Sequence, residues 1–277
     1  MHKNKNISKR FKISFIFIGL TLLTIGGAKL SKYNTGLSEQ QFYKVAQKVA
    51  SLYEQEIKAK NKQLILRPLW NETDMAYAHD IVEYNQLEVT VTGDYARKPG
   101  MTADALALLF CHEFGHLFGG APYRTFLASS SEGQSDYYST LKCFKKYAKD
   151  DDNKKIVFRM GKKITHDIYK PCYTVYKNTP DLYVCLRGTV AAYQLIRAQN
   201  PNAKLSLTDK STHITDFNLT MDHPDPQCRL DTLIAGLLCN VKGELSNDDY
   251  KKGTCVKGKG HPLGKRPLCM FNPNSNT

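Results

Sequence analysis

The amino-acid sequence predicts a mostly helical α+β fold, with a small sheet in front and helices stabilised by disulfides. Three observations lead to this prediction: several long segments with helical apolar spacing, one short segment that alternates apolar and polar residues, and eight cysteines. With 277 residues, 42% of them hydrophobic and 23% charged, the chain has the composition of a globular protein. We find no internal repeat and no low-complexity linker.

Residues 1–28 have the pattern of a signal peptide. Five Lys and Arg residues lie between positions 3 and 12, an apolar run follows from Ile13 to Ile25, and Gly26-Gly27-Ala28 offers small residues for cleavage. An uncleaved anchor is the alternative, but a membrane span needs about 20 apolar residues. We therefore expect an exported chain, periplasmic or secreted, with no stable membrane span after cleavage.

The charge of the chain is basic. The formal net charge of +13 falls to +8 if the five basic residues of positions 1–28 are removed. A basic surface can attract anionic envelope polymers or acidic proteins. The excess lysines are dispersed along the chain and no nucleic-acid motif is present, so we interpret this surface as simply solvated and expect no nucleic-acid partner.

The cysteines predict up to four disulfides in an oxidising compartment. They stand at Cys111, Cys143, Cys172, Cys185, Cys228, Cys239, Cys255 and Cys269. Cys228 and Cys239 are expected on one helix, about 16 Å apart, which is too far for a bridge. A Cys255–Cys269 bridge across the Gly/Lys-rich loop would be geometrically easy.

The first elements lie before residue 93. Residues 38–60 predict a helix, with Ser38 as its cap, so residues 29–62 form an N-terminal helical segment packed on the main domain. Leu64-Ile65-Leu66 predicts a short extended segment. Residues 87–92 alternate apolar and polar side chains, which predicts a half-buried strand.

The central helix is predicted between Thr102 and Gly119. Thr102 can cap it, its body is strongly apolar, and Gly119-Gly120 followed by Pro122 ends it. Its last two turns carry Cys111-His112-Glu113-Phe114-Gly115-His116.

Further helices are predicted at residues 131–146, 154–168 and 182–198, and from Asp225-Pro226 to about Cys239. The acidic stretch 150–153 separates the first two. We expect the main domain to cover residues 63–240. The Cys-containing tail, residues 241–277, is expected to be irregular and held by disulfides.

The H-E-x-x-H motif on the central helix is half of a catalytic zinc site. His112 and His116 are four residues apart, so both rings point from one helix face, about 6 Å apart along its axis. Glu113 can act as general base toward a water molecule. The preceding Cys111 points about 100° away around the helix, and we interpret it as packed or disulfide-bonded.

A catalytic zinc site needs a third protein ligand. The candidates in the sequence are Glu132, Asp136, His166, His213 and His223. Glu132 and Asp136 form an E-x-x-x-D pair, one turn apart on a predicted helix. Glu132 could reach the metal while Asp136 accepts a hydrogen bond from a ligand imidazole. Taken alone, the pair is more readily interpreted as an ordinary acidic helix start.

These motifs together resemble the gluzincin metallopeptidases. Residues 221–229, Met-Asp-His-Pro-Asp-Pro-Gln-Cys-Arg, further resemble the H-P-x-x-x-x-R motif of the CaaX-prenyl-protease type, a group that includes heat-shock membrane proteases and soluble periplasmic relatives. The resemblance runs in patches from about residue 70 to 240. Met75 stands where the family usually has Asn.

The resemblance implies a zincin-like catalytic domain with one Zn²⁺ per chain. It implies His112, His116 and Glu132 as ligands and Asp136 as the partner of a ligand imidazole. It also implies that His223 donates to the oxyanion, and that Arg229 orients this region or binds substrate backbone.

The expected function is therefore exported metalloendopeptidase, with a protein or peptide substrate that pairs with an edge strand near residues 87–92. Two alternatives remain open on the same residues: a cell-wall peptide hydrolase, and an envelope assembly or chaperone-like factor with a latent zinc site covered by the tail. A purely structural zinc site suits Glu113 less well.

Overall fold

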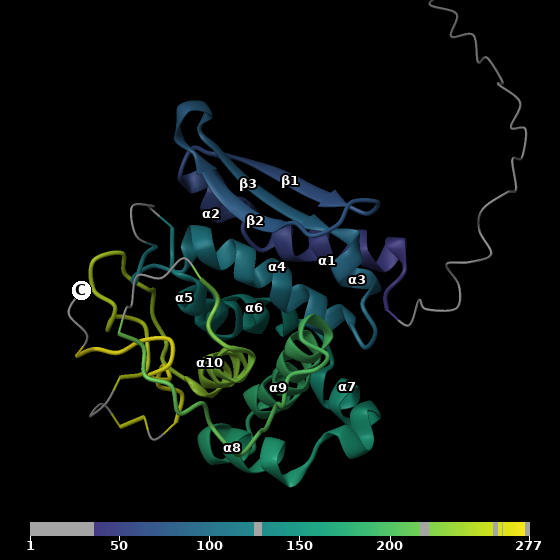
Figure 1. The fold of residues 1–277 in the computed structure, drawn as a ribbon, viewed down its shortest axis with the longest axis vertical. Coiled ribbons are helices and arrows are strands. Elements are labelled where there is room, and N and C mark those ends of the chain that lie inside the picture. Colours follow the sequence, from purple (N-terminus) through teal and green to yellow (C-terminus); the bar gives the residue numbers. More distant parts are fainter. Residues whose placement is uncertain (1–35, 125–128, 217–221, 257–259, 262, 275–277) are drawn as a thin grey trace, which may run out of the picture. The chain divides into compact units, whose positions relative to one another are not determined.

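A computed structural model describes residues 36–124, 129–216, 222–256, 260–261 and 263–274 (Figure 1). The chain from Asn34 onward forms one compact unit. The predicted signal peptide, residues 1–28, lies outside the described residues. In the part of the chain that is described, no helix is long and apolar enough to cross a membrane.

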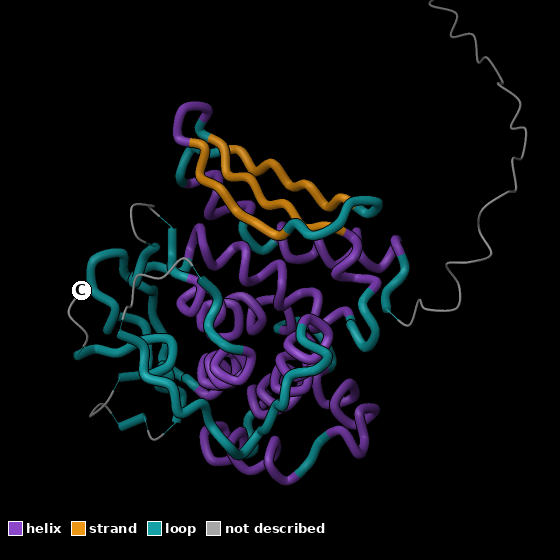
Figure 2. Tube along the Cα trace, in the orientation of Figure 1, coloured by secondary structure: helices purple, strands orange, loops and turns teal. Residues whose placement is uncertain are grey.

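The unit is an α+β structure, as predicted. Its elements in chain order are α1 (Glu39–Ser51), α2 (Glu54–Ala59), β1 (Gln63–Leu69), β2 (Ala76–Ile81), η1 (Val82–Tyr84), β3 (Gln86–Thr92), α3 (Gly93–Arg97), α4 (Ala103–Phe118), α5 (Glu132–Tyr138), η2 (Ser139–Cys143), α6 (Phe144–Ala148), α7 (Asn153–Met160), η3 (Gly161–Lys163), α8 (His166–Tyr176), α9 (Pro180–Gln199) and α10 (Pro226–Leu238). Figure 2 shows one small sheet stacked on a larger group of helices.

The sheet has the strand order β1-β3-β2, with β3 parallel to β1 and antiparallel to β2. The strand predicted at residues 87–92 is therefore present as β3, and its Leu87, Val89 and Val91 are buried. The expectation that this strand pairs with substrate is wrong, because β3 is central and both of its sides are already hydrogen-bonded. The edges of the described sheet are β1 and β2.

The predicted helix at residues 38–60 is interrupted. It begins as expected, with a capping box between Ser38 and Gln41 and an apolar face that includes Phe42. It breaks before α2, where Tyr53 turns inward. The Tyr53 ring stacks on Phe114 with 4.3 Å between centroids, and its hydroxyl pairs with that of Tyr138 at 2.9 Å. This tertiary anchor explains the break.

Helix α4 is the centre of the unit. Thr102 caps it by accepting a hydrogen bond from the Ala105 N–H, and Gly119 follows its last residue, as predicted. Every residue from Ala105 to His116 is buried. The helix contacts β2 and β3 on one side and α5, α9 and η2 on the others. A helix enclosed in this way can hold its polar side chains in fixed positions.

Two other predicted helices have different outcomes. The helix predicted at 131–146 is confirmed: it begins at the Ser131 cap and runs through α5, the π-helical turn η2 and α6 without a break in helical backbone. The segment 154–168 is not one helix: α7 ends at Met160, Gly161 has a positive φ of 53°, and α8 begins only at His166. Helix α10 begins with Asp225 as its cap, as predicted.

Four disulfides are formed, between Cys111 and Cys143, Cys172 and Cys185, Cys228 and Cys269, and Cys239 and Cys255. The exclusion of a Cys228–Cys239 bridge is confirmed. The easy Cys255–Cys269 pairing is not the one formed, because each of these two cysteines reaches one end of α10. The described residues after position 240 contain turns but no helix or strand, so the predicted irregular, disulfide-held tail is also confirmed.

Candidate metal site

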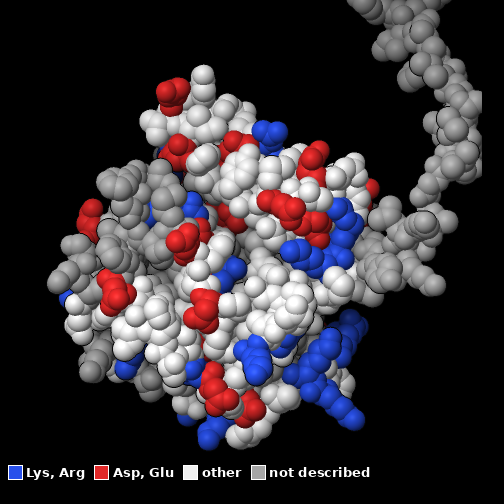
Figure 3. All heavy atoms as spheres, viewed as in Figure 1, with Lys and Arg blue, Asp and Glu red and all other residues white. Residues whose placement is uncertain are grey.

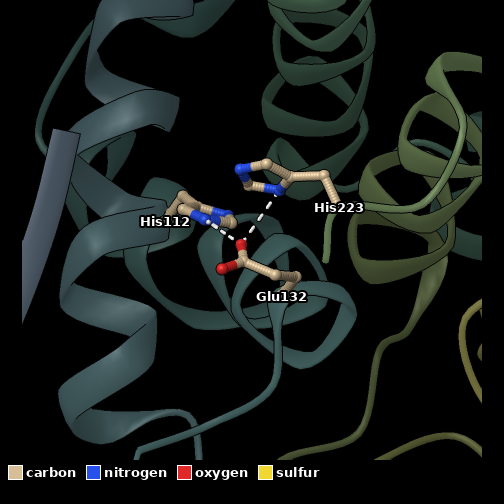
Figure 4. A group of neighbouring side chains, drawn as sticks. All are labelled: His112, Glu132 and His223. Carbon is tan, nitrogen blue, oxygen red and sulfur yellow. Dashed lines mark hydrogen bonds and ion pairs between the residues drawn. The ribbon is translucent and has the colours of Figure 1, made fainter. Parts of the chain in front are cut away.

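Three side chains that could hold a metal ion meet beside α4 (Figure 4). Glu132 Oε2 lies 3.1 Å from His112 Nε2 and 2.9 Å from His223 Nδ1. The candidate ligand atoms of all three residues lie within 4.8 Å of one another. They come from the end of α4, the first residue of α5 and the loop before α10. No other group of this spacing exists among the residues that the structure describes.

The site forms because α5 packs closely against α4. Gly115 faces Ser135, and a Cβ at position 115 would lie 2.8 Å from Ser135 Cα. Only glycine permits this approach. The Cys111–Cys143 disulfide adds a covalent link between α4 and η2. Because Ser131 caps α5, Glu132 stands at the first position of this helix and its side chain reaches the histidines.

A chain of buried contacts orients His112. Its Nδ1 lies 2.7 Å from Asp136 Oδ1, and Arg229 donates to both carboxylate oxygens of Asp136, from Nε at 2.8 Å and from Nη2 at 2.9 Å. Burial opposes ionisation of Asp136, but Arg229 and His112 hold its pKa below its usual range. The Asp136 carboxylate can therefore accept a hydrogen bond from the His112 Nδ1–H. Nε2 is then the ring nitrogen that would face a metal, and in this structure it lies 3.1 Å from Glu132 Oε2.

The contacts of Arg229 fit one of the two roles that the resemblance implies, orientation of this region. Arg229 is buried and its guanidinium contacts Asp136 and Gln199. These contacts lie behind Asp136 as seen from His112. Arg229 is therefore a positioning residue, and it acts through Asp136.

His116 lies beside this group but has another partner. Its Nδ1 is 2.8 Å from the Ser130 carbonyl oxygen, to which it can donate, so Nε2 carries the lone pair. Burial and the neighbouring His112 lower the pKa of His116 to about 3, so the ring is neutral. Its Nε2 is 3.6 Å from Glu132 Oε2 but only 2.7 Å from Arg124 Nη2. The predicted ligand set and the observed group thus differ in one member, with His223 in place of His116.

Sequence reasoning missed Arg124. Its guanidinium donates to His116 Nε2 and also contacts Glu132 Oε1. Arg124 lies in the loop between α4 and α5, and this loop folds back because the Ser131 N–H bonds to the Pro122 carbonyl. No motif position in the sequence marks an arginine there.

Glu113 is the group with an unsatisfied atom. Its side chain is buried on α4, and Oε2 has no hydrogen-bond partner among the described residues. Burial raises the pKa of Glu113 to about 7, against the opposing effect of His112. A carboxylate that titrates near neutrality and keeps one oxygen free can accept a proton and return it.

Three further histidines of the described residues lie apart from this group. His79, His166 and His213 are exposed, and none belongs to the group with metal-ligand spacing. Of the five candidates for the additional ligand, the structure brings Glu132 and His223 to the site and places Asp136 behind His112.

Comparisons with models of known protein families, with curated proteins and with solved structures found no match. The functional case therefore depends on the site itself. What the structure presents is a His112–Glu132–His223 group that could hold a metal ion, next to a buried glutamate with an unpaired oxygen.

Proposed function

We propose that the chain is an exported zinc-dependent metalloendopeptidase that hydrolyses peptide bonds with Glu113 as general base. The observation that supports this most is the unpaired, buried Glu113 Oε2 beside the His/Glu/His group. Such a donor set, with one further open position, is typical of catalytic rather than structural zinc. Four disulfides suit an exported protein.

If His112, Glu132 and His223 hold a zinc ion, it would supply Lewis-acid polarisation of the scissile carbonyl and would lower the pKa of a bound water. The other roles belong to the chain itself. Glu113 takes a proton from the attacking water and passes it to the leaving amine nitrogen. Asp136 and Arg229 keep the His112 ring in one tautomer and one orientation.

The second histidine ligand has two candidates. The resemblance favours His116, whose Nε2 becomes free when Arg124 moves away, with His223 as a donor to the oxyanion. The observed distances favour His223 directly. Metal stoichiometry of His116→Ala and His223→Ala variants decides between them, because only loss of a ligand should reduce the bound metal.

The substrate path that we propose uses β2 instead of β3. Strand β2 is an edge of the described sheet and contacts α4, which carries His112 and Glu113. An extended peptide could pair with its free backbone groups. The exposed edge thus favours an unfolded protein or a flexible segment as substrate.

The test combines metal content with cleavage of an unfolded protein such as casein. We expect wild type to bind one zinc per chain and to cleave. Glu113→Gln should keep the metal and lose cleavage, while Glu83→Gln, on the exposed turn η1, should behave as wild type. A chain that binds no metal, or a fully active Glu113→Gln variant, contradicts the proposal. Purified peptidoglycan as a parallel substrate tests cell-wall peptide hydrolysis.

A second candidate function is supported by Arg124. Its guanidinium contacts His116 and Glu132, both implied metal ligands, as expected for an envelope factor whose metal site is latent. Zinc binding without cleavage of either substrate, in wild type and in an Arg124→Met variant, would favour this second function.

A further inference from the structure

The exposed face of α7 and η3 concentrates positive charge. Five basic residues and no acidic residue lie between positions 153 and 166: Lys154, Lys155, Arg159, Lys162 and Lys163. In the view of Figure 3, a group of Lys and Arg side chains projects over the region of α7. The sequence suggested that the excess basic residues are dispersed. The structure instead places five of them together on one face. We call these five residues and Phe158 the α7 face.

Phe158 stands in the middle of this charge. It is 86% exposed, more than any other large apolar side chain in the described part of the chain. Lys154 and Lys155 lie four and three residues before it on α7, so both flank it on one side of the helix. Lys162 follows in η3, after α7 has ended. The inward side of α7 is formed by Val157, which is buried. The core therefore already has its apolar contact, and Phe158 is left pointing outward.

Acidic residues border the α7 face at both ends: Asp150, Asp151 and Asp152 precede α7, and Asp167 follows η3. Asp151 pairs with Arg187 at 2.8 Å and with Lys48 at 3.1 Å. Asp152 caps α7 by accepting a hydrogen bond from the Lys155 N–H at 3.0 Å. The acids thus lie at the ends of the α7 face, and the stretch from position 153 to 166 contains five basic residues and no acidic one.

The combination fits an anionic bilayer surface better than a folded partner. Lysine is a flexible point charge that suits a diffuse layer of head groups. A single aromatic ring that protrudes from among the basic side chains can enter the head-group region of the bilayer. Burial of the apolar ring there adds to the electrostatic attraction between the basic side chains and the lipid. A nucleic acid would use the lysines but would give one isolated Phe ring little to bind unless bases were unstacked.

We propose that the α7 face docks the protein on an anionic lipid bilayer, with Phe158 inserted between head groups and the basic side chains around it. The lipid is identified by its negative head-group charge, supplied for example by phosphatidylglycerol. This binding does not depend on the metal site or on the proposed peptidase activity.

The experiment is vesicle flotation of the full chain. Vesicles of phosphatidylcholine with about 30% phosphatidylglycerol should carry the protein, and pure phosphatidylcholine vesicles should not. Because each basic residue near such a surface contributes about a fivefold factor in binding, Lys154→Gln/Lys155→Gln should lower the partition coefficient about 25-fold. Phe158→Ser should lower it about tenfold. Binding should also weaken strongly at 0.5 M salt, where the Debye length is about 4 Å.

Matched controls use the same chemistry elsewhere. Val82→Ser removes another exposed apolar side chain, 72% exposed on η1, and Lys58→Gln/Lys60→Gln removes two basic residues on and after α2. Both should bind vesicles as wild type does. Equal losses in control and α7 variants, or no preference for anionic vesicles, overturn the proposal. The proposal is also overturned if the protein is retained on a DNA column but does not bind vesicles.

Discussion

Replacement of Arg124 by methionine should make metal binding tighter while it makes the metal-free protein less stable. In the structure the Arg124 guanidinium donates to His116 Nε2 at 2.7 Å and contacts Glu132 Oε1. The His116 Nε2 lone pair can serve the guanidinium or a metal ion, but not both. Metal binding at His116 therefore has to break this contact.

The size of the effect follows from a closed thermodynamic cycle. Hydrogen bonds to charged groups contribute about 1.5–3 kcal/mol. The contacts of Arg124 with His116 and Glu132 exist only in the metal-free protein if metal binding breaks them. Their removal then lowers the free energy of unfolding of the metal-free protein by about 1.5–3 kcal/mol. It makes the free energy of metal binding more favourable by the same amount. This corresponds to about a tenfold to hundredfold lower Kd for zinc.

The two changes can be measured separately. Urea denaturation of chelator-treated protein gives the loss of stability, and competition with a chromophoric chelator gives the zinc Kd. Arg67→Met is the control, because Arg67 pairs with Glu88 on the exposed side of the sheet. An unchanged or weaker zinc affinity in Arg124→Met refutes the reasoning, since an arginine that only supports the fold would lower stability and metal affinity together.

Three further predictions follow from the buried contacts. Asp136→Asn should weaken zinc binding about tenfold to a hundredfold, since His112 loses the carboxylate that orients it, and a wild-type Kd would contradict this role. Gly115→Ala should lower the melting temperature and the zinc affinity together, because the added Cβ meets the Ser135 backbone at 2.8 Å. Lys145→Met should stabilise the protein most below pH 7, by a few kcal/mol at most, as urea titrations at pH 6, 8 and 10 can show.

The sign of the Lys145 effect comes from its environment. Burial lowers the pKa of Lys145 to about 7, against the attraction of Asp181, and its Nζ contacts the Tyr176 hydroxyl and the Cys239 carbonyl. An unfolded lysine titrates near 10.4. The cost of keeping Lys145 charged is thus fully present below pH 7 and disappears as pH rises toward 10. A stability difference that stays constant over this range, or that matches the Lys146→Met control, contradicts the assignment.

Local features of the fold were predictable because their causes lie close together in the sequence. Thr102 and Ser131 cap α4 and α5 through backbone groups three residues away. The position of His112 near the end of a buried helix follows from apolar spacing and the Gly119 stop. The position of Glu132 was also predictable, because the Ser131 cap places it at the start of α5.

Features that depend on distant contacts were not predictable. The break before α2 comes from Tyr53, whose hydroxyl meets that of Tyr138, 85 residues away in the sequence. The central position of β3 depends on pairing with both β1 and β2, and strand order leaves no local mark. The contact of Arg124 with His116 exists only because the loop between α4 and α5 folds back.

The Cys111–Cys143 disulfide has a consequence for the order of events in the life of the chain. It joins the residue next to His112 to the turn that follows α5, across 32 residues of sequence. In a reducing cytosol, where such bonds do not persist, a newly made chain lacks this link between α4 and η2. We therefore expect the candidate metal site to be held less firmly in a reduced chain than in an oxidised one. For the same reason, recombinant protein should be produced in an oxidising compartment.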